Sequence, residues 1–363
     1  MSKKFTTGAA SASRSILGAA VLAGVIGLGA APGSAEEELN ALVWCDHTDP
    51  SLIQPFEEKY GVKVNLKEYE GTGTALSILE QSQPGDWDVF VLDGVDVPRI
   101  VEAGILSELP ADQLPLDDVF EQLQMRDVTF VDGKMYAITE KFGYNVVGYD
   151  KSKVDPEDMR DLSTLWGDKY KGKIAVYDYY IPMMDLVALY LGMDPTEISA
   201  ETLPKIKEAL FQMKDNAAMV GEVVSSTTAL ATGEADVLLG GGEWAVAVMQ
   251  DDNPNLDWVL PDQGGIMWTQ ALGVFETSQK KDLALKFVQY IMSPEGQARL
   301  AMTSCYWGMP ANSKAGDVLT DAQKARLRWD EQPSFLKKSH RYFIPDAELD
   351  AQMLDVWTEF LQR

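Results

Sequence analysis

Short apolar runs and amphipathic segments alternate along the first third of this chain. Residues 41–44 read as a buried strand, and residues 50–60 as a helix that Gly61 ends. Residues 62–67 then alternate with a period of two, as a strand does. The same order recurs in a helix at 74–81, a strand at 87–92 and a helix at 97–103. This alternation predicts a mostly parallel sheet with helices on both faces.

The pattern changes after a turn signal at Asp132-Gly133. Residues 134–139 and 144–149 read as two strands, which we interpret as a crossing between domains. A second α/β run follows, with strands at 173–177, 217–221 and 236–240 and helices at 183–191, 203–214 and 228–232. The chain is therefore predicted to contain two sheets. Its 363 residues are enough for two domains.

The first 35 residues have the pattern of a secretory signal. Lys3, Lys4 and Arg14 precede an apolar run at 16–30, small residues follow to Ala35, and three glutamates come next. The apolar run is shorter than the ~20 residues that a membrane-spanning helix needs. We therefore expect export, with cleavage after about Ala35.

The charge balance is strongly acidic. With 31 basic and 56 acidic residues the formal net charge is −25, and removal of the leader's three basic residues would make it −28. This excess argues against nucleic acid or an anionic membrane as a partner, because both are neutralised by clustered lysine and arginine. It suits a cationic solute, although solubility alone also explains it.

The loops that follow the predicted strands are rich in aromatic and acidic residues. Ligands of open α/β sheets bind beyond the carboxyl ends of the strands. Aromatic faces attract ammonium groups and carboxylates accept their hydrogen bonds, so these loops predict an amine site, although any single aromatic could belong to the core. The loop residues are Cys45-Asp46-His47, Asp93, Asp96, Asp178-Tyr179-Tyr180, Glu243-Trp244, Trp268 and Gln270.

The sequence gives little support for a catalytic site or a metal site. His47 and His340 are the only histidines, so a histidine-rich centre cannot form. Cys45-Asp46-His47 suggests a metal or thiol site, but successive residues of a strand point to opposite faces, so the three cannot all face one ion without a turn. Asp178 and Asp185 could form the acid pair of a secreted hydrolase, but a proline lies between them. We expect no enzyme activity and no cofactor.

Several stretches resemble the periplasmic spermidine/putrescine-binding proteins, the solute receptors of polyamine ABC importers. The likeness spans nearly the whole chain after the leader, in one order. The stretches that carry it are Leu165-Trp166 with residues 169–173, residues 233–236, 264–272 and 284–294, and Cys305-Tyr306 with Pro310 and Asn312.

The resemblance implies a two-lobe periplasmic-binding-protein fold of the α/β class, in which crossing strands join the lobes. Lobe 1 would contain residues 36–141 and 269–317, and lobe 2 residues 142–268 and 318–363. Each lobe would be a mostly parallel sheet flanked by helices, and the solute would be held by hinge closure. The implied protein is a periplasmic monomer that delivers a small amine, such as a polyamine, to an ABC permease. A signalling receptor would have the same sequence features.

The resemblance also implies a site, but only part of the family's pattern is present. Trp44, Trp268 and Tyr306 match its aromatic positions, whereas Tyr179, Pro182 and Gln270 stand at its acidic ones. Cys45 and His47 replace a threonine and a tyrosine, Asp93 replaces a serine, and Trp244 lies three residues beyond a missing tryptophan. The expected ligand-binding residues are Trp44, Cys45, His47, Asp93, Asp178, Tyr179, Glu243, Trp244, Trp268, Gln270 and Tyr306.

Two questions stay open at this point. Asp93, Asp178 and Glu243 could replace the missing acidic positions and hold a diamine, but a γ-amino acid, a quaternary ammonium compound or another monocation fits equally. Cys45 and Cys305, the only cysteines, could form one disulfide near the cleft or remain two free thiols.

Overall fold

The structure is a computed structural model, and it describes residues 37–363. The leader and its expected cleavage after about Ala35 lie outside the described residues. The described residues form one compact unit. Within residues 37–363, no helix has the length and apolar character needed to cross a bilayer.

A sheet of 11 strands organises this unit, in the order β2-β1-β3-β11-β6-β9-β7-β8, with β10 and β12 pairing with β6 and β13 pairing with β11. The pairs β1–β2, β1–β3, β7–β8 and β7–β9 are parallel. The strands of the sheet are β1 (Glu37–Val43), β2 (Val62–Glu68), β3 (Val89–Asp93), β6 (Ala137–Asp150), β7 (Ile174–Tyr177), β8 (Ala217–Gly221), β9 (Val237–Gly242), β10 (Leu256–Val259), β11 (Gly265–Val274), β12 (Met309–Pro310) and β13 (Ser339–Arg341).

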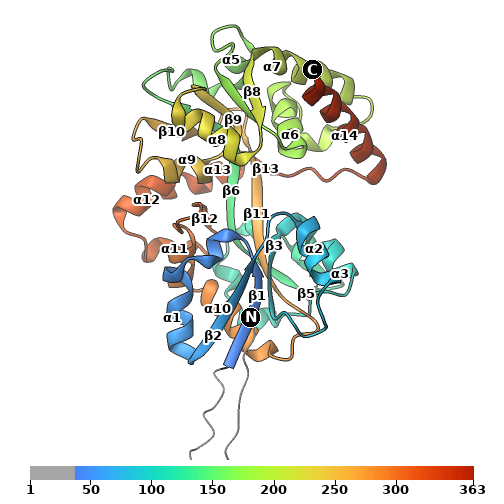
Figure 1. Ribbon diagram of the computed structural model, residues 1–363, viewed down its shortest axis with the longest axis vertical. Helices are drawn as coiled ribbons and strands as arrows, with labels where there is room; N and C mark the ends of the chain where they lie inside the picture. The colour runs from blue at the N-terminus through green and yellow to red at the C-terminus, as the bar shows by residue number, and fades with distance from the viewer. Residues whose placement is uncertain (1–36) are drawn as a thin grey trace, which may run out of the picture. The chain divides into compact units, whose positions relative to one another are not determined.

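The prediction of two separate sheets is wrong. The strands β6 and β11 pair with each other and with strands of both groups, so hydrogen bonds connect the two halves into one sheet. Figure 1 shows these two strands running between the β1–β3 group and the β7–β9 group. The two strands predicted at 134–139 and 144–149 are also wrong, because Ala137–Asp150 is one continuous strand. The charged pair Glu140-Lys141 interrupts the apolar pattern in the middle of this strand, so the sequence was interpreted as two strands.

The predicted turn at Asp132-Gly133 is confirmed. Both residues have positive φ, 52° and 78°, and they join β4 (Phe130–Val131) to β5 (Lys134–Met135) in a separate hairpin. The predicted lobe boundaries fall inside β6, inside β11 and directly after the short helix Ser313–Asp317. They stay predictions.

Helices cover the sheet. Gly61 ends the first one with a φ of 65°, as predicted. The α-helices are α1 (Pro50–Tyr60), α2 (Thr72–Glu80), α3 (Val97–Glu102), α4 (Arg126–Thr129), α5 (Leu162–Trp166), α6 (Tyr180–Tyr190), α7 (Leu203–Asn216), α8 (Val223–Thr232), α9 (Glu243–Met249), α10 (Lys281–Ile291), α11 (Pro294–Leu300), α12 (Asp321–Leu327), α13 (Gln332–Lys338) and α14 (Ala347–Gln362).

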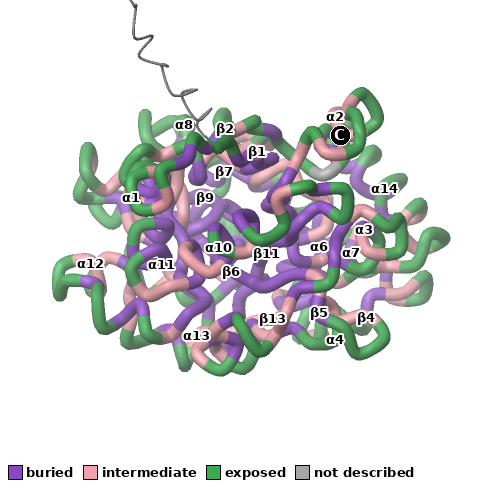
Figure 2. Tube along the Cα trace, turned by 90° about the horizontal axis from the view of Figure 1, so that it is seen from below, coloured by how far each residue is buried: buried purple, intermediate pink, exposed green. Residues whose placement is uncertain are grey.

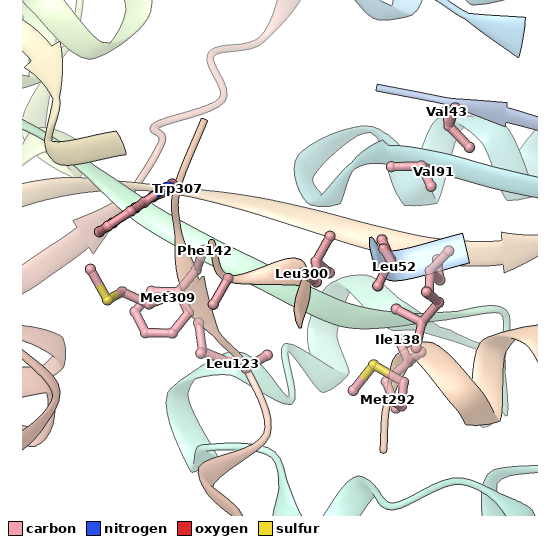
Figure 3. Close-up of a cluster of buried hydrophobic side chains, with 14 of the residues drawn as sticks. Val43, Leu52, Val91, Leu123, Ile138, Phe142, Met292, Leu300, Trp307 and Met309 are labelled. Atoms are coloured by element: carbon pink, nitrogen blue, oxygen red, sulfur yellow. The ribbon is translucent and has the colours of Figure 1, made fainter. Parts of the chain in front are cut away.

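The first group of strands has an apolar core on each face. Val43 and Val91 pack with Leu52 and Phe56 of α1 on one face, whereas Phe90 and its neighbours pack against α2 and α3 on the other. This alternation follows from the two-residue period of a strand. Figure 3 shows the first core continuing to Phe142 of β6, with Leu123, Met309 and Trp307 around it. Figure 2 shows β6, β9 and β11 buried, with the exposed residues gathered in outer helices and loops.

Two helices near the second group begin earlier than predicted. The helix expected at 183–191 begins at Tyr180, because Pro182 lies in its first turn, where a helix tolerates proline. The helix expected at 228–232 begins at Val223. Ser225 and Ser226 are therefore inside α8, where both hydroxyls donate to the carbonyl of Glu222.

Candidate ligand-binding site

One face of the central strands carries most of the polar side chains predicted from the sequence. Gln270 of β11 lies opposite Asp93 of β3 on one side and Lys141 of β6 on the other. Trp268, two residues along the same face, lies opposite Gly143. Cross-strand neighbours point to the same side of a sheet, so these residues share a surface.

The residues after β1 fold into a short 3-10 turn, Cys45–Thr48. The objection that Cys45, Asp46 and His47 cannot all face one ion assumed a strand, and it does not apply to this turn. Asp46 and His47 are both wholly buried, and His47 Nδ1 lies 3.0 Å from Asp46 Oδ1. Asp46, which was expected only as part of the loop after the first strand and not as a ligand-binding residue, is central to this surface.

Four charged residues form a closed buried network. His47 Nε2 lies 3.2 Å from Glu140 Oε2, and Lys141 Nζ donates to Asp46 Oδ2 over 3.0 Å. The amide of Gln270 donates to both carboxylates, at 3.1 Å to Asp46 and 3.0 Å to Glu140. The network therefore contains two carboxylates and two cationic side chains, and none of the four is exposed.

The electrostatics of this network keep Asp46 and His47 charged. Burial alone would raise the pKa of Asp46, but attraction to Lys141 and His47 holds it well below its usual range. Burial would lower the pKa of His47, but Glu140 and Asp46 raise it to about 10. Burial lowers the pKa of Lys141, and Asp46 offsets part of that effect. Around neutral pH, Asp46 is an anion and His47 is an imidazolium.

A disulfide joins Cys45 to Cys305, with 6.0 Å between the Cα atoms. It connects the 3-10 turn to the loop that carries Tyr306. A cysteine nucleophile and a thiolate metal ligand are thereby both ruled out at Cys45 in this oxidised form. Among residues 37–363, no cluster of three or more histidine, cysteine or acidic side chains is arranged to hold a metal ion.

Three aromatic rings meet beside the network. The ring of Tyr306 lies 6.0 Å from that of Trp244 and 6.1 Å from that of Trp268, both edge to face. Its hydroxyl donates to Gln270 Oε1 over 2.7 Å. Trp268 is only 8% exposed. Three of the residues predicted to bind a ligand are therefore in contact, although they come from distant parts of the chain.

Glu243 completes this aromatic corner. It begins α9, it is wholly buried, and its Oε2 accepts from the backbone N–H of Tyr144 over 2.8 Å. Within the part of the chain that the structure describes, the other oxygen, Oε1, has no hydrogen-bond partner, and neither has Trp268 Nε1. Burial raises the pKa of Glu243 to about 8 despite its backbone hydrogen bonds. A buried carboxyl group with a free oxygen is a place where a cation would be stabilised.

Gly143 makes this arrangement possible. A Cβ atom at that position would lie 2.1 Å from Glu243 Oε1 and 2.5 Å from Trp268 Cζ2. The side chain of Glu243 and the indole of Trp268 therefore both occupy the space that any other residue would fill.

Asp93 and Tyr179 form a second corner. Burial and the neighbouring Asp96 raise the pKa of Asp93 to about 7. Burial raises the pKa of Tyr179 and Tyr342, and the negative charge of Asp93 adds to both shifts. The rings of Tyr179 and Tyr342 meet edge to face at 5.8 Å. The sequence analysis missed Tyr342.

Two more of the predicted residues, Asp178 and Trp44, stay predictions as ligand contacts. Asp178 Oδ1 accepts from the indole N–H of Trp357 on α14 over 2.8 Å. Trp44 packs against the apolar cores on both faces of β1, and among the described residues its buried Nε1 has no hydrogen-bond partner. Asp185, the other half of the supposed acid pair, accepts from the backbone N–H of Phe343, so Asp178 and Asp185 have separate partners. Glu140 and Lys141 were not predicted as site residues. Two charged residues in the middle of an otherwise apolar strand could have indicated them.

Comparison with known proteins agrees with this fold. A model of the bacterial extracellular solute-binding protein family matches residues 51–326. The chain belongs to this family. The match confirms the resemblance that the sequence motifs indicated. Solute-binding proteins of ABC transporters are not enzymes as a family.

Among its relatives, the spermidine/putrescine-binding periplasmic protein of Escherichia coli K12 is 27% identical over 304 residues, covering 81% of this chain and 83% of the relative. The spermidine/putrescine ABC transporter substrate-binding protein of Streptococcus pneumoniae superposes with a TM-score of 0.78 at 16% identity, covering 90% of this chain and 99% of that chain. MotA from A. tumefaciens B6, solved in complex with glucopine, superposes with a TM-score of 0.69 at 15% identity, covering 90% and 100%. These structures confirm the predicted two-lobe α/β fold.

Proposed function

We propose that this protein captures a small solute bearing an ammonium group and delivers it to an ABC permease, without covalent chemistry. The observation that carries the proposal is the buried carboxyl group of Glu243 beside Trp268. Its Oε1 has no partner, and the residue is wholly buried. An ammonium group there would supply the missing hydrogen bond and balance the charge of the ionised carboxylate.

The aromatic rings fit the same ligand class. Trp268 and Trp244 both adjoin Tyr306, and an indole face attracts a cation by about 0.5 to 2 kcal/mol, depending on how dry the site is. Asp93 offers a second carboxyl group near Tyr179. Two carboxyl corners along one sheet face support a polyamine, and the name of the Escherichia coli relative gives spermidine and putrescine.

A second candidate is an amine that also carries a hydrogen-bond acceptor, such as a γ-amino acid. It is favoured by Trp268 Nε1, a buried donor without a partner. An ammonium group has no acceptor to offer this N–H, whereas a carboxylate has. A quaternary ammonium group has no N–H to donate to Glu243 Oε1, so a ligand of this class ranks third.

The setting of the proposed activity is the periplasm, with the protein acting as a monomer. The leader pattern at residues 1–35 supports export, and the relatives' names support a periplasmic location. The disulfide supports an oxidising compartment, because such bridges are rare in the cytosol.

A thermal-shift screen of the purified protein tests the proposal. The panel contains putrescine, spermidine, 4-aminobutyrate, betaine and, as an uncharged control, 1,4-butanediol. We expect at least one amine to stabilise the protein by about 2.7 kcal/mol at 100 times its Kd. Trp268→Phe and Glu243→Gln should lower the affinity for that amine at least tenfold, which at the same concentration reduces the stabilisation to about 1.4 kcal/mol or less. Trp87→Phe, which changes an indole bonded to Ser82 in the predicted first lobe, should leave the affinity unchanged. Stabilisation by none of the amines would contradict the proposal.

A further inference from the structure

Lys141 places an ammonium group of the protein's own on an aromatic ring of the candidate site. Its Nζ lies 4.0 Å from the centre of the Tyr306 ring and donates to Asp46 Oδ2 over 3.0 Å. It also donates to the backbone carbonyl of Tyr306 over 3.3 Å. A carboxylate, a carbonyl and a ring face are the groups that an amine ligand would seek.

The surrounding charges leave no opening for a second cation at this point. Asp46 Oδ2 accepts from Lys141 and Gln270, and Asp46 Oδ1 faces His47. The oxygens of Glu140 are taken by His47 and Gln270. Two carboxylates thus face two cations, and the network is electrically balanced without any ligand.

The chain makes specific room for this lysine. A Cβ atom on Gly308 would lie 2.5 Å from Lys141 Cε and 3.1 Å from Trp268 Cη2. The stem of Lys141 and the edge of Trp268 therefore both lie against the bare backbone of Gly308. Among residues 37–363, Lys141 is also the only lysine that is buried.

Stability by itself explains such a lysine poorly. Replacing a buried ion pair by apolar side chains of similar volume is often neutral or stabilising. A buried charge on the same sheet face as Trp268 and Gln270 is better explained by what it does to the ligand.

We infer that Lys141 is a specificity-determining residue, because its ammonium group fills a subsite made by Asp46 and Tyr306. The ligand therefore carries one ammonium group fewer than the carboxyl groups and rings of the site could hold without Lys141. This inference about the ligand rests on the proposed function. The ammonium group that the ligand brings lies instead at Glu243 and Trp268, where a carboxylate oxygen is free.

Rescue of a truncated side chain tests the subsite. Lys141→Ala removes the atoms of propylammonium and leaves Asp46 Oδ2 without its cation, whereas Lys141→Met removes the charge but fills the space. We expect propylammonium to raise the melting temperature of Lys141→Ala by several degrees, with no such rise in Lys141→Met or in the unchanged protein. The uncharged 1-propanol should have no effect. Equal shifts in all three proteins would overturn the inference.

The ligand part is tested by affinities for 1,4-diaminobutane and butylammonium, which share a chain and differ by one ammonium group. We expect the ratio of the two affinities to rise at least tenfold from the unchanged protein to Lys141→Ala. An unchanged ratio would overturn the inference. If the unchanged protein binds neither amine nor any other of the panel, the proposed function fails, while the propylammonium rescue still decides whether the subsite exists.

Should Lys141→Ala not fold, crystals of the unchanged protein decide the same point. After soaking in 1,4-diaminobutane, Lys141 Nζ should stay within hydrogen-bond distance of Asp46, with the ligand nitrogens elsewhere. A ligand nitrogen on Asp46 and Tyr306, with Lys141 displaced, would overturn the inference. If the crystals take up no diamine, refolding of Lys141→Ala is measured with and without propylammonium. Folding only in the presence of the amine supports the subsite. Equal behaviour with and without the amine overturns the inference.

Discussion

Cys45 and Cys305, which are 260 positions apart in the sequence, are joined by a disulfide that brings the turn carrying Asp46 and His47 next to the loop carrying Tyr306. Each cysteine directly adjoins a residue of the buried network or the aromatic corner. The bridge therefore fixes two distant parts of the chain on one side of the candidate site.

We predict that breaking this bridge lowers stability by about 2–5 kcal/mol, because it closes a very long loop in the unfolded chain. Denaturant titration of the oxidised and the reduced, alkylated protein measures the difference. The double variant Cys45→Ser/Cys305→Ser should match the reduced protein and should not respond to reductant. Equal midpoints for oxidised and reduced protein would show that the bridge contributes nothing.

Glu243 should make stability depend on pH. The folded protein keeps a proton on this carboxyl group up to about pH 8, whereas the unfolded chain releases it near the ordinary value of 4.5. Its contribution is complete below about pH 4.5 and is lost as the pH rises towards 8. Glu243→Gln imitates the protonated form. Its free energy of unfolding, relative to that of the unchanged protein, should therefore increase as pH rises, by up to about 4 kcal/mol.

The measurement is urea unfolding of both proteins between pH 5 and 8.5. Glu234→Gln serves as the control, since Glu234 is exposed and its replacement should leave the pH profile unchanged. Parallel profiles for Glu243→Gln and the unchanged protein would mean that Glu243 is not protonated in the folded state.

Amine binding at pH 7 should release protons. A ligand cation beside Glu243 favours the ionised carboxylate, so the pKa falls from about 8 and the proton leaves. Affinity should then increase between pH 6 and 8. Calorimetry in phosphate and Tris buffers should report about one proton released, and Glu243→Gln should release less. A binding enthalpy independent of the buffer would count against a role for this carboxyl group.

Gly143→Ala should lower both the stability of the protein and its affinity for an amine. The added methyl group would press on Glu243 Oε1 and on the ring of Trp268, and neither can move freely, because Tyr144 holds the carboxylate and Tyr306 adjoins the ring. We expect a loss of about 1–3 kcal/mol in stability and at least tenfold in amine affinity. Gly73→Ala is the matched control, since nothing lies within 4 Å of its added Cβ. Similar behaviour of the two variants would refute the packing argument.

Asp178 should prove structural. Asp178→Ala removes the acceptor of the Trp357 indole and should cost about 1 kcal/mol in stability. We expect its amine affinity to stay within twofold of that of the unchanged protein. A tenfold loss of affinity measured by calorimetry would instead place Asp178 in contact with the ligand.

Sequence patterns predicted the local structure well where neighbouring residues decide it. Gly61 and Asp132-Gly133 adopt the positive φ values expected of a helix end and a hairpin turn. The aromatic corner of Trp244, Trp268 and Tyr306 was also predicted, because each residue follows a strand or matches a family motif. In contrast, β6 was divided in two, since a charged pair inside an apolar run imitates a strand boundary.

The chain alone determined the order of strands and helices, the export leader pattern and the family, because periodicity and short motifs are properties of neighbouring residues. Only the tertiary structure decided which charges meet. The network is built from three separate segments of the chain, which carry Asp46, Glu140 with Lys141, and Gln270. The residues next to each of them in the sequence do not indicate which carboxylate pairs with which cation. Pairing over such distances depends on the register of β3, β6 and β11, which packing of the whole sheet fixes.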